Sequence, residues 1–307
     1  MRPASSDLRR RHVVLVGSTA SGKSALALEV ARRLGEMELV SADSMQVYRG
    51  MDVGTAKATP AERTEVPHHL LDVADPEEDY SVARFQADVA EVIAGIEARG
   101  RRALVVGGTG LYVRAVVDGL ALPGEWPALK AALEAERPGE LHRRLRELDP
   151  LAASRIEPGN ARRLVRALEV TLGSGRPFSS FGPGLGTYPP SPRFRLAGVW
   201  LPRPVLADRI DARYRRQLAA GFLAEVRGLR ARMSRTARQA LGYKELLAHV
   251  AGDCTLEEAV AAAASRTREF ARRQRAWFRR DPRITWLGAP ADPLDLLPAL
   301  LGDWSLP

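Results

Sequence analysis

The stretch from residue 13 to residue 34 constrains the fold of this chain more than any other. The apolar run Val13 to Val16 leads into Gly17-Ser18-Thr19-Ala20-Ser21-Gly22-Lys23-Ser24, which matches the pattern G-x-x-x-x-G-K-[ST]. From Ser24 to Leu34, apolar residues then recur at helical spacing. A strand, a glycine-rich loop and a helix in this order predict a phosphate-binding loop at the end of a buried strand.

Each part of this loop has a physical role in the prediction. The two glycines let the backbone wrap closely, so that its N–H groups and the helix N-terminus face phosphate oxygens. Lys23 would neutralise the phosphates, and the Ser24 hydroxyl would ligate Mg²⁺. The alternative is an ordinary glycine-rich turn, but the strand before it and the helix after it favour phosphate binding.

The rest of the chain predicts an α/β fold with a helical insertion. Short apolar strands at Leu39–Val40 and Ala103–Val106 alternate with amphipathic helices such as Val82–Ala98, which indicates a P-loop NTPase-like (nucleotide-kinase-like) parallel sheet flanked by helices. We expect residues 1–119 to form the first part of this core. Residues 120–192, rich in Ala, Leu, Glu and Arg and closed by a Gly/Pro/Ser stretch, predict an all-helical insertion domain. Residues 193–307 would complete the core, with a return strand at 195–201 and arginine-rich C-terminal helices.

The positive charge of the chain is concentrated near its C-terminal end. Of the 307 residues, 46 are Lys or Arg and 37 are Asp or Glu, a net charge of +9. Eight arginines lie between Arg266 and Arg283, against only Glu269 and Asp281. Solvated surface helices usually alternate the sign of their charges, whereas an unbalanced arginine stripe favours contact with a nucleic-acid backbone.

Cysteine content and hydropathy exclude several classes of protein. The single Cys254 can form neither an internal disulfide nor a cysteine-rich zinc site, which points to a reducing compartment. No stretch approaches 18 apolar residues, and the N-terminal region lacks the apolar run of an export signal. We therefore expect a cytoplasmic protein without membrane contact.

Two further loops follow predicted strands and carry candidate catalytic groups. Asp43 could act as a base or hold Mg²⁺ through water, and Gln46 could read a purine edge; the alternatives are a helix cap and a solvated amide. Thr109 could donate to a leaving-group oxygen, although its loop alone is an ordinary strand-to-helix turn. Lys57, in the loop that begins at Gly54, could reach a phosphate. The strand before Gly107 lacks the terminal Asp of many ATP hydrolases, which weakens that interpretation.

Taken in order, these motifs resemble one family, the tRNA dimethylallyltransferases or tRNA isopentenyltransferases, in the bacterial form without a zinc-finger tail. The resemblance runs from about residue 12 to 286 and rests on these segments: 17–24, 43–57, 67–72, 107–112, 162–170, 239–245 and 267–278. The chain departs from the family at Ser18, where Pro is usual, and around Arg155 to Asn160, where a His and an Asp are missing.

The resemblance implies transfer of a dimethylallyl group from dimethylallyl diphosphate to N6 of the adenosine 3′ of the anticodon in tRNA, with Mg²⁺. Asp43 would be the general base and Thr109 would contact the bridging oxygen of the diphosphate, which residues 17–24 and Lys57 would bind. The implied tRNA contacts, to the anticodon stem-loop, are Asp43, Ser44, Met45, Gln46, Arg162, Arg163, Arg166, Gln239, Arg272, Arg273, Gln274, Arg275 and Trp277. We expect a monomer.

Three other functions remain open from the sequence. A nucleoside or metabolite kinase has the same phosphate loop. A prenyltransferase could act on free adenine nucleotides, although the basic helix is poorly suited to so small an acceptor. A non-catalytic RNA-binding protein could use the loop as a nucleotide switch, but Asp43 beside Gln46 has no role in that function.

Overall fold

The computed structural model describes residues 11–181 and 185–304, and its contacts separate two compact units. The first unit contains the described residues up to Asp118 and from Pro190 onward; the second is Gly119–Pro189. The sequence places the insertion at 120–192; the second unit begins one residue earlier and ends three residues earlier. No helix in the described part of the chain is long and apolar enough to cross a membrane.

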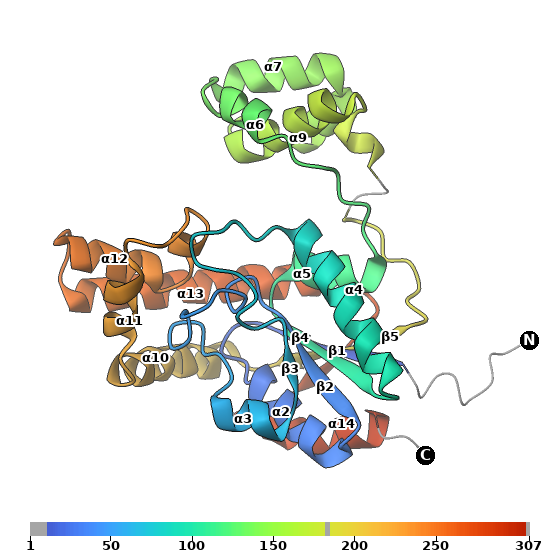
Figure 1. Cartoon of the computed structure of the whole chain (residues 1–307), viewed down its shortest axis with the longest axis vertical. Helices are drawn as coiled ribbons and strands as arrows, with labels where there is room; N and C mark the ends of the chain where they lie inside the picture. The colour runs from blue at the N-terminus through green and yellow to red at the C-terminus, as the bar shows by residue number, and fades with distance from the viewer. Residues whose placement is uncertain (1–10, 182–184, 305–307) are drawn as a thin grey trace, which may run out of the picture. The chain divides into compact units, whose positions relative to one another are not determined.

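A six-stranded parallel sheet forms the centre of the first unit, as far as the structure describes it. Its strands are β1 His12–Gly17, β2 Met37–Ala42, β3 His68–His69, β4 Arg102–Gly107, β5 Phe194–Trp200 and β6 Ile284–Gly288 (Figure 1). They lie in the order β3-β2-β4-β1-β5-β6. Val16 pairs with Gly107, which also pairs with Ala42, so the loops after β1, β2 and β4 leave the sheet at one edge.

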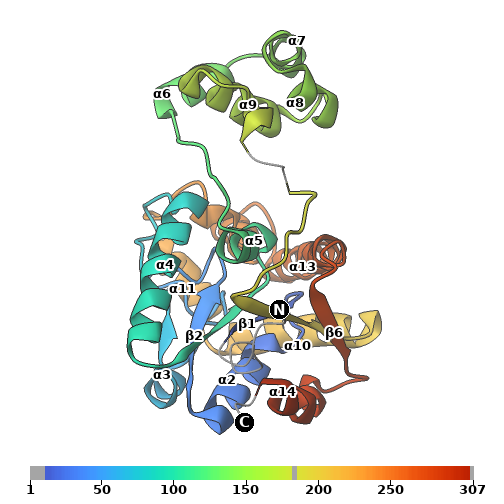
Figure 2. The ribbon, with the colours of Figure 1, turned by 90° about the vertical axis from the view of Figure 1, so that its right-hand side faces the viewer.

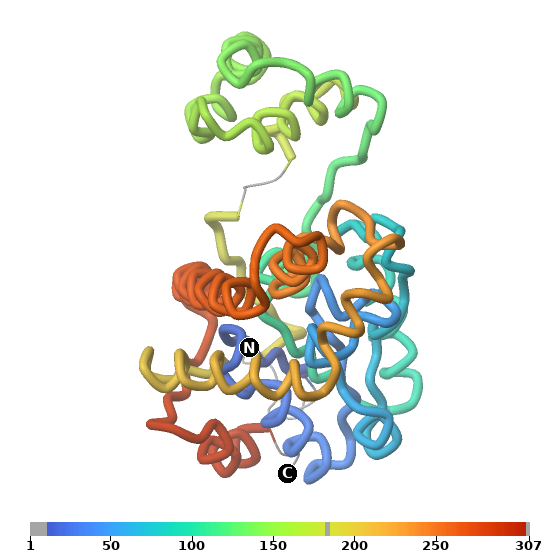
Figure 3. The backbone as a smooth tube through the Cα atoms, turned by 90° about the vertical axis from the view of Figure 1, so that its left-hand side faces the viewer, coloured from blue at the N-terminus to red at the C-terminus, as the bar shows by residue number. Residues whose placement is uncertain are grey.

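Helices cover both faces of this sheet. They are α2 Lys23–Leu34, α3 Pro60–Glu65, α4 Val82–Ala98, α5 Gly110–Asp118, α10 Arg203–Ala219, α11 Phe222–Leu229, α12 Tyr243–Ala251, α13 Leu256–Phe278 and α14 Leu297–Trp304, with 3₁₀ turns η2 Ala237–Gln239 and η3 Pro293–Leu296. Helices α2 and α14 pack together (Figure 2). Helix α10 runs beside α13 (Figure 3).

The side chains of each strand point alternately to the two faces of the sheet, and this gives the sheet two hydrophobic clusters, one on each face. Val13 and Leu15 point to the face covered by α2 and α14, whereas Val14 and Val16 belong to the larger cluster on the other face. Neighbouring side chains of a strand point to opposite faces of the sheet, so a continuous apolar run is buried when both faces are covered by helices. This doubly covered sheet confirms the predicted fold class.

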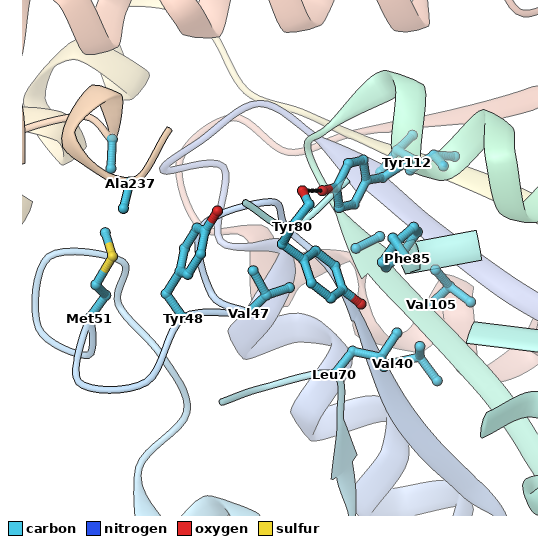
Figure 4. Close-up of a cluster of buried hydrophobic side chains, with 14 of the residues drawn as sticks. Val40, Val47, Tyr48, Met51, Leu70, Tyr80, Phe85, Val105, Tyr112 and Ala237 are labelled. Atoms are coloured by element: carbon cyan, nitrogen blue, oxygen red, sulfur yellow. Dashed lines mark hydrogen bonds between the residues drawn. The ribbon is translucent and has the colours of Figure 1, made fainter. Parts of the chain in front are cut away.

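The larger cluster also anchors the loop that follows β2. Val47, Tyr48 and Met51 of this loop are fully buried, and Figure 4 draws them beside Tyr80 and the ring pair Phe85–Tyr112. The centroids of that ring pair lie 4.2 Å apart. Burial of side chains from residue 47 onward fixes the loop, and with it the position of Asp43 at the sheet edge.

β1 begins at a buried histidine that is held neutral. Nδ1 of His12 accepts the backbone N–H of Ala103 at 3.0 Å, so this nitrogen carries no proton. Its Nε2 lies 2.9 Å from Glu97 Oε1 and is the donor. Burial lowers the pKa of His12, although the Glu97 carboxylate acts in the opposite direction. Protonation of Nδ1 would place its N–H against the N–H of Ala103 and remove this hydrogen bond. The contact between the first residue of β1 and β4 therefore requires the neutral ring.

The second unit is a small helical bundle with its own core. Its helices are α6 Pro127–Glu134, α7 Pro138–Leu148, α8 Pro150–Arg155 and α9 Ala161–Ser174, followed by the turn η1 Phe178–Ser180. Leu133, Leu141 and Leu164 are buried at its centre. Helices α6 and α7 both pack against α9, as Figure 1 shows. Gly173 is required because a Cβ there would lie 2.1 Å from the Trp126 ring.

Candidate active site

A cavity of about 560 Å³ opens at the carboxyl edge of the sheet in the first unit. Its walls are the loops after β1, β2 and β4, the 54–56 loop, and helices α10, α12 and α13. The predicted site residues that line it are Thr19, Ala20, Gly22, Lys23, Ser24, Asp43, Ser44, Met45, Gln46, Thr109, Gln239, Arg273 and Gln274. Ligands of parallel α/β sheets bind at this edge, so the cavity is the candidate active site.

The phosphate loop has the backbone conformation that its glycines require. Gly22 has a φ of +80°, and a Cβ there would also lie 2.2 Å from Pro293, so only glycine fits. Lys23 reaches back over the loop, with Nζ 3.5 Å from the carbonyl oxygen of Ser18. Ser18 and Ser21 are buried behind the cavity rather than lining it. The hydroxyl of Ser21 has no hydrogen-bond partner in the part of the chain that the structure describes.

The surroundings of Lys23 make its positive charge unfavourable in the absence of an anion. Burial lowers the pKa of the Lys23 ammonium to about 8, the nearby Asp43 carboxylate raises it, and Arg213 lowers it further. A phosphate in the cavity would supply the negative charge that the buried ammonium lacks. The loop therefore gains electrostatic stabilisation by binding an anion.

Asp43 and Thr109 lie close together because Ser44, the residue after Asp43, is hydrogen-bonded to Thr109. Asp43 accepts the backbone N–H of Met45 on one carboxylate oxygen at 2.9 Å, and the other oxygen has no hydrogen-bond partner among the described residues. The hydroxyl of Thr109 accepts the backbone N–H of Ser44 at 3.4 Å and keeps its own proton to donate. A proton acceptor and a hydroxyl donor therefore face the same cavity as Lys23.

Three arginines of α10, which the sequence analysis overlooked, complete the phosphate side of the cavity: Arg209, Arg213 and Arg216. Arg213 donates to Thr19 Oγ1 and to the carbonyl oxygen of Gly54, each at 3.1 Å. Arg209 donates to the carbonyl oxygen of Ala20 at 3.0 Å. Their spacing of four and three residues puts them on one face of a helix. This spacing can be read from the sequence and would have identified the three arginines.

The charge of the cavity walls is strongly positive. The cationic side chains are Lys23, Arg209, Arg213, Arg216, Arg266 and Arg273. Among the described lining residues, Asp43 is the only carboxylate. Such a cavity suits a polyanion with one proton-accepting group beside it.

Glu225 of α11, also overlooked, fixes the 52–54 loop at the mouth of the cavity. Its carboxylate accepts the backbone N–H groups of Asp52 at 2.9 Å, Val53 at 2.7 Å and Gly54 at 3.0 Å, and the hydroxyl of Tyr243. A Cβ on Gly54 would lie 2.4 Å from the Tyr243 ring, so glycine is required for this close approach. The motif around Gly54 is thus explained by packing.

The structure corrects the assignment of Lys57 to the diphosphate. Its Nζ donates to the carbonyl oxygen of Tyr48 at 2.7 Å, to Asp52 at 2.7 Å and to Asp72 at 2.6 Å. These bonds use all three ammonium protons, the side chain is 1% exposed, and Lys57 does not line the cavity. Lys57 is a buried structural cation.

Two amides predicted to contact RNA are hydrogen-bonded to the protein. Gln274 lines the cavity but is only 7% exposed, and its amide bridges the backbone of Thr19 and Gly108, so its contact with RNA stays a prediction. Gln46 accepts from Ser41 Oγ at 2.8 Å and donates to the carbonyl oxygen of Thr55 at 3.2 Å. Reading of a base edge by Gln46 stays a prediction, and it would require these bonds to be exchanged.

Several predicted RNA-contacting cations also have protein partners. In the second unit, Arg166 donates to the carbonyl oxygens of Pro123 at 3.0 Å and Gly124 at 3.1 Å, so it secures that segment rather than projecting freely. In the first unit, Arg275 lies 3.5 Å from the centre of the Trp200 ring. Both arginines are partly exposed, and RNA contact by them stays a prediction.

The remaining predicted cations are open to solvent. Arg162 and Arg163 are exposed at the start of α9 in the second unit. Arg272 and Arg273 are exposed on α13, where their ion pairs to Glu269 are long, at 4.0 and 3.9 Å, and Arg273 also lies 5.8 Å from the centre of the Phe270 ring. Trp277 is half-buried against Gly110, where a Cβ would lie 2.2 Å from the indole nitrogen.

A metal site would have to share its ligands with a bound anion. No group of three His, Cys, Asp or Glu side chains in the described ranges 11–181 and 185–304 is arranged to hold a metal. The Ser24 hydroxyl and the Asp43 carboxylate both line the cavity. Mg²⁺ typically takes one or two protein oxygens together with phosphate oxygens and water. The hydroxyl and the carboxylate are oxygen donors of this kind, so the residues present fit Mg²⁺.

Comparison with known proteins gives consistent matches over nearly the whole chain. The family model described as IPP transferase matches residues 46–281, and that described as isopentenyl transferase matches residues 11–74. A tRNA dimethylallyltransferase from Kineococcus radiotolerans is 52% identical over 92% of this chain and 93% of its own length. The full-length tRNA isopentenylpyrophosphate transferase of Bacillus halodurans, a crystal structure, is 37% identical, with a TM-score of 0.69 over 96% of this chain and 97% of its own. A eukaryotic dimethylallyltransferase acting on tRNA is 26% identical, with a TM-score of 0.76 over 92% of this chain and 74% of its own.

Proposed function

Because this chain belongs to the tRNA dimethylallyltransferase family, we propose that it transfers a dimethylallyl group from dimethylallyl diphosphate to N6 of the adenosine 3′ of the anticodon in tRNA. The observation that carries the proposal is the meeting of Lys23, Asp43 and Thr109 in one cation-lined cavity. We further propose that the enzyme acts as a monomer in the cytoplasm, where its tRNA substrate is found.

The reaction needs one bond to form and one to break. The N6 nitrogen attacks C1 of the dimethylallyl group, the bond from C1 to the diphosphate oxygen breaks, and the N6 proton passes to Asp43. An exocyclic amine is a weak nucleophile, so alignment and stabilisation of the leaving group supply most of the rate. The adenine must leave its stack to enter the cavity.

Negative charge develops on the diphosphate as this bond breaks. Lys23, Arg209 and Arg213 line the phosphate side of the cavity and would stabilise that charge. Thr109 would donate its hydroxyl proton to the bridging oxygen. When bound, Mg²⁺ would supply further charge neutralisation, held by the Ser24 hydroxyl and, through water, by Asp43.

The test is incubation with unmodified tRNA and isotopically labelled dimethylallyl diphosphate. We expect label in the tRNA, located at the adenosine 3′ of the anticodon by nuclease digestion and mass spectrometry. Transfer of the γ-phosphate of ATP without prenylation would contradict the proposal and favour a kinase. Label on free adenine nucleotides but not on tRNA would identify the other acceptor.

Asp43→Asn separates chemistry from binding. Asparagine keeps the oxygen that accepts the Met45 N–H but cannot take a proton. We expect transfer to fall by about 10²-fold or more, with tRNA affinity retained. Equal loss of transfer and of tRNA binding would mean that Asp43 has a structural role.

A further inference from the structure

The amide of Gln274 connects two catalytic loops through the interior of the protein. Oε1 of Gln274 accepts the backbone N–H of Thr19 in the phosphate loop at 2.7 Å. Nε2 donates to the backbone carbonyl oxygen of Gly108 at 2.8 Å. Both contacts are buried, and each end of the amide is therefore committed to the backbone of a different loop.

Glycine at position 108 is what permits this contact. A Cβ at Gly108 would lie 2.3 Å from Nε2 of Gln274 and 3.2 Å from the carbonyl oxygen of Gly17. Gly108 has an ordinary backbone conformation, so the reason for glycine is the close approach of the amide rather than a positive φ. The next residue, Thr109, carries the hydroxyl that faces the cavity.

Gln274 is carried by a long helix whose buried face holds it in place. Gln274 lies in the 23-residue helix α13, with Ala271 and Phe278 buried on the same face. A helix held by its buried face transmits position without bending at each residue, whereas the two glycine-rich loops have little rigidity of their own. The sheet fixes the base of both loops, since Val16 pairs with Gly107, and the helix adds a second anchor for the residues beyond it.

We propose that Gln274 is a positioning residue that sets the distance between the phosphate loop and Thr109, and hence between the diphosphate and the hydroxyl donor. The proposal rests on the proposed function, because it assigns these two loops to one leaving group. It predicts a specific loss of catalytic rate, since a displacement of about 1 Å can lower a rate about 10²-fold.

The first test compares two substitutions on the same buried face of α13. Gln274→Met keeps the length of the side chain and removes both hydrogen bonds. Thr267→Val is the matched control, because it removes a different buried hydrogen bond, the 2.8 Å contact with Tyr214, and Thr267 does not line the cavity. We expect Gln274→Met to lower kcat about 10²-fold, with the dissociation constants of tRNA and inorganic diphosphate within about threefold of wild type. We expect Thr267→Val to keep kcat. Retained kcat in Gln274→Met, or parallel loss of tRNA affinity, would overturn the proposal.

The second test uses the close contact with Gly108. Gly108→Ala should displace the amide and lower kcat. Adding it to Gln274→Ala should cost much less, because removal of the amide leaves only the 3.2 Å contact of the new methyl group with the Gly17 carbonyl oxygen. Strong non-additivity of this kind marks two residues that act through one contact. Independent, multiplying losses would contradict a shared positioning role.

A third readout does not depend on catalysis. Hydrogen exchange at the Thr19 amide should be slow in the wild type and in Thr267→Val, and faster in Gln274→Met. If the wild type transfers no prenyl group, the proposed function fails, and this exchange measurement still tests the positioning of the phosphate loop. Unchanged exchange in Gln274→Met would refute the link.

Discussion

Replacing Glu225 by glutamine should loosen the 52–54 loop and cost about 2–4 kcal/mol of unfolding free energy. The carboxylate accepts three backbone N–H groups and one phenol hydroxyl, so its two oxygens serve four donors. Glutamine offers one oxygen and an NH₂ group. Its oxygen can keep Asp52 and Val53, and its NH₂ can donate to the Tyr243 oxygen, but the N–H of Gly54 then loses its partner.

The magnitude follows from that arrangement. A buried donor without a partner costs about 1–3 kcal/mol, and exchanging charge-assisted hydrogen bonds for neutral ones costs about 1 kcal/mol more. The loop also carries the Gly54 carbonyl oxygen that accepts from Arg213, so the KM for the prenyl diphosphate should rise.

Urea denaturation of wild type and variant measures the change in stability. The matched control is Glu77→Gln, the same chemical change at a surface carboxylate that is 54% exposed and paired with Arg232. Exposed ion pairs contribute about 0–1 kcal/mol, so this control should remain close to wild type. If Glu225→Gln unfolds at the same urea concentration as Glu77→Gln, the role assigned to the carboxylate is wrong.

Three further predictions concern a buried cation, a buried histidine and the exposed face of α13. Lys57→Met should lower stability by about 1–3 kcal/mol, because the Tyr48 carbonyl oxygen and Asp52 lose their donor while Asp72 keeps Arg63. Folded protein should keep its diphosphate affinity, and a selective loss of that affinity would restore Lys57 to the site. Burial lowers the pKa of His12, so the unfolded state binds the proton more tightly than the folded state. The stability due to the neutral ring is therefore present above pH 6.5 and is lost as the pH falls below it. His12→Asn cannot titrate, so urea denaturation at pH 5 and pH 8 should show a smaller pH dependence of its stability than in the wild type. Replacing Arg272 and Arg273 by glutamine should reduce the slope of log tRNA affinity against log salt by about 2, as filter binding at several salt concentrations would show.

The fold class and the phosphate loop could be predicted because their signals are local. A β-branched run, two glycines at fixed spacing and a helical repeat each depend on neighbours in the chain, and the strand at Val13–Val16 lies within β1. The expected helix at 82–98 has the same bounds as α4. Strands β3 and β6 were not anticipated, because the first has only two residues and the second contains just a short apolar run.

The candidate site was only partly predictable, because a side chain's type does not determine its partner. Asp43 and Thr109 follow strands whose carboxyl ends share an edge, so topology alone brings them together. Lys57 and Gln274 also lie in motifs that carry the family resemblance, yet both are hydrogen-bonded to the protein. Lys57 binds Tyr48 and Asp72, which are near it in the chain, and Gln274 binds the backbone of the distant Thr19 and Gly108.

The sequence by itself determined the order of elements, the phosphate loop and the excess of positive charge, since these depend on residue type and spacing along the chain. Only the tertiary structure decided which charges face the cavity. Arg213 lies 194 positions from Thr19 in the sequence, and Gln274 lies 255 positions away. A buried polar group must find a hydrogen-bond partner wherever the packing of the helices provides one, and that choice is made in three dimensions.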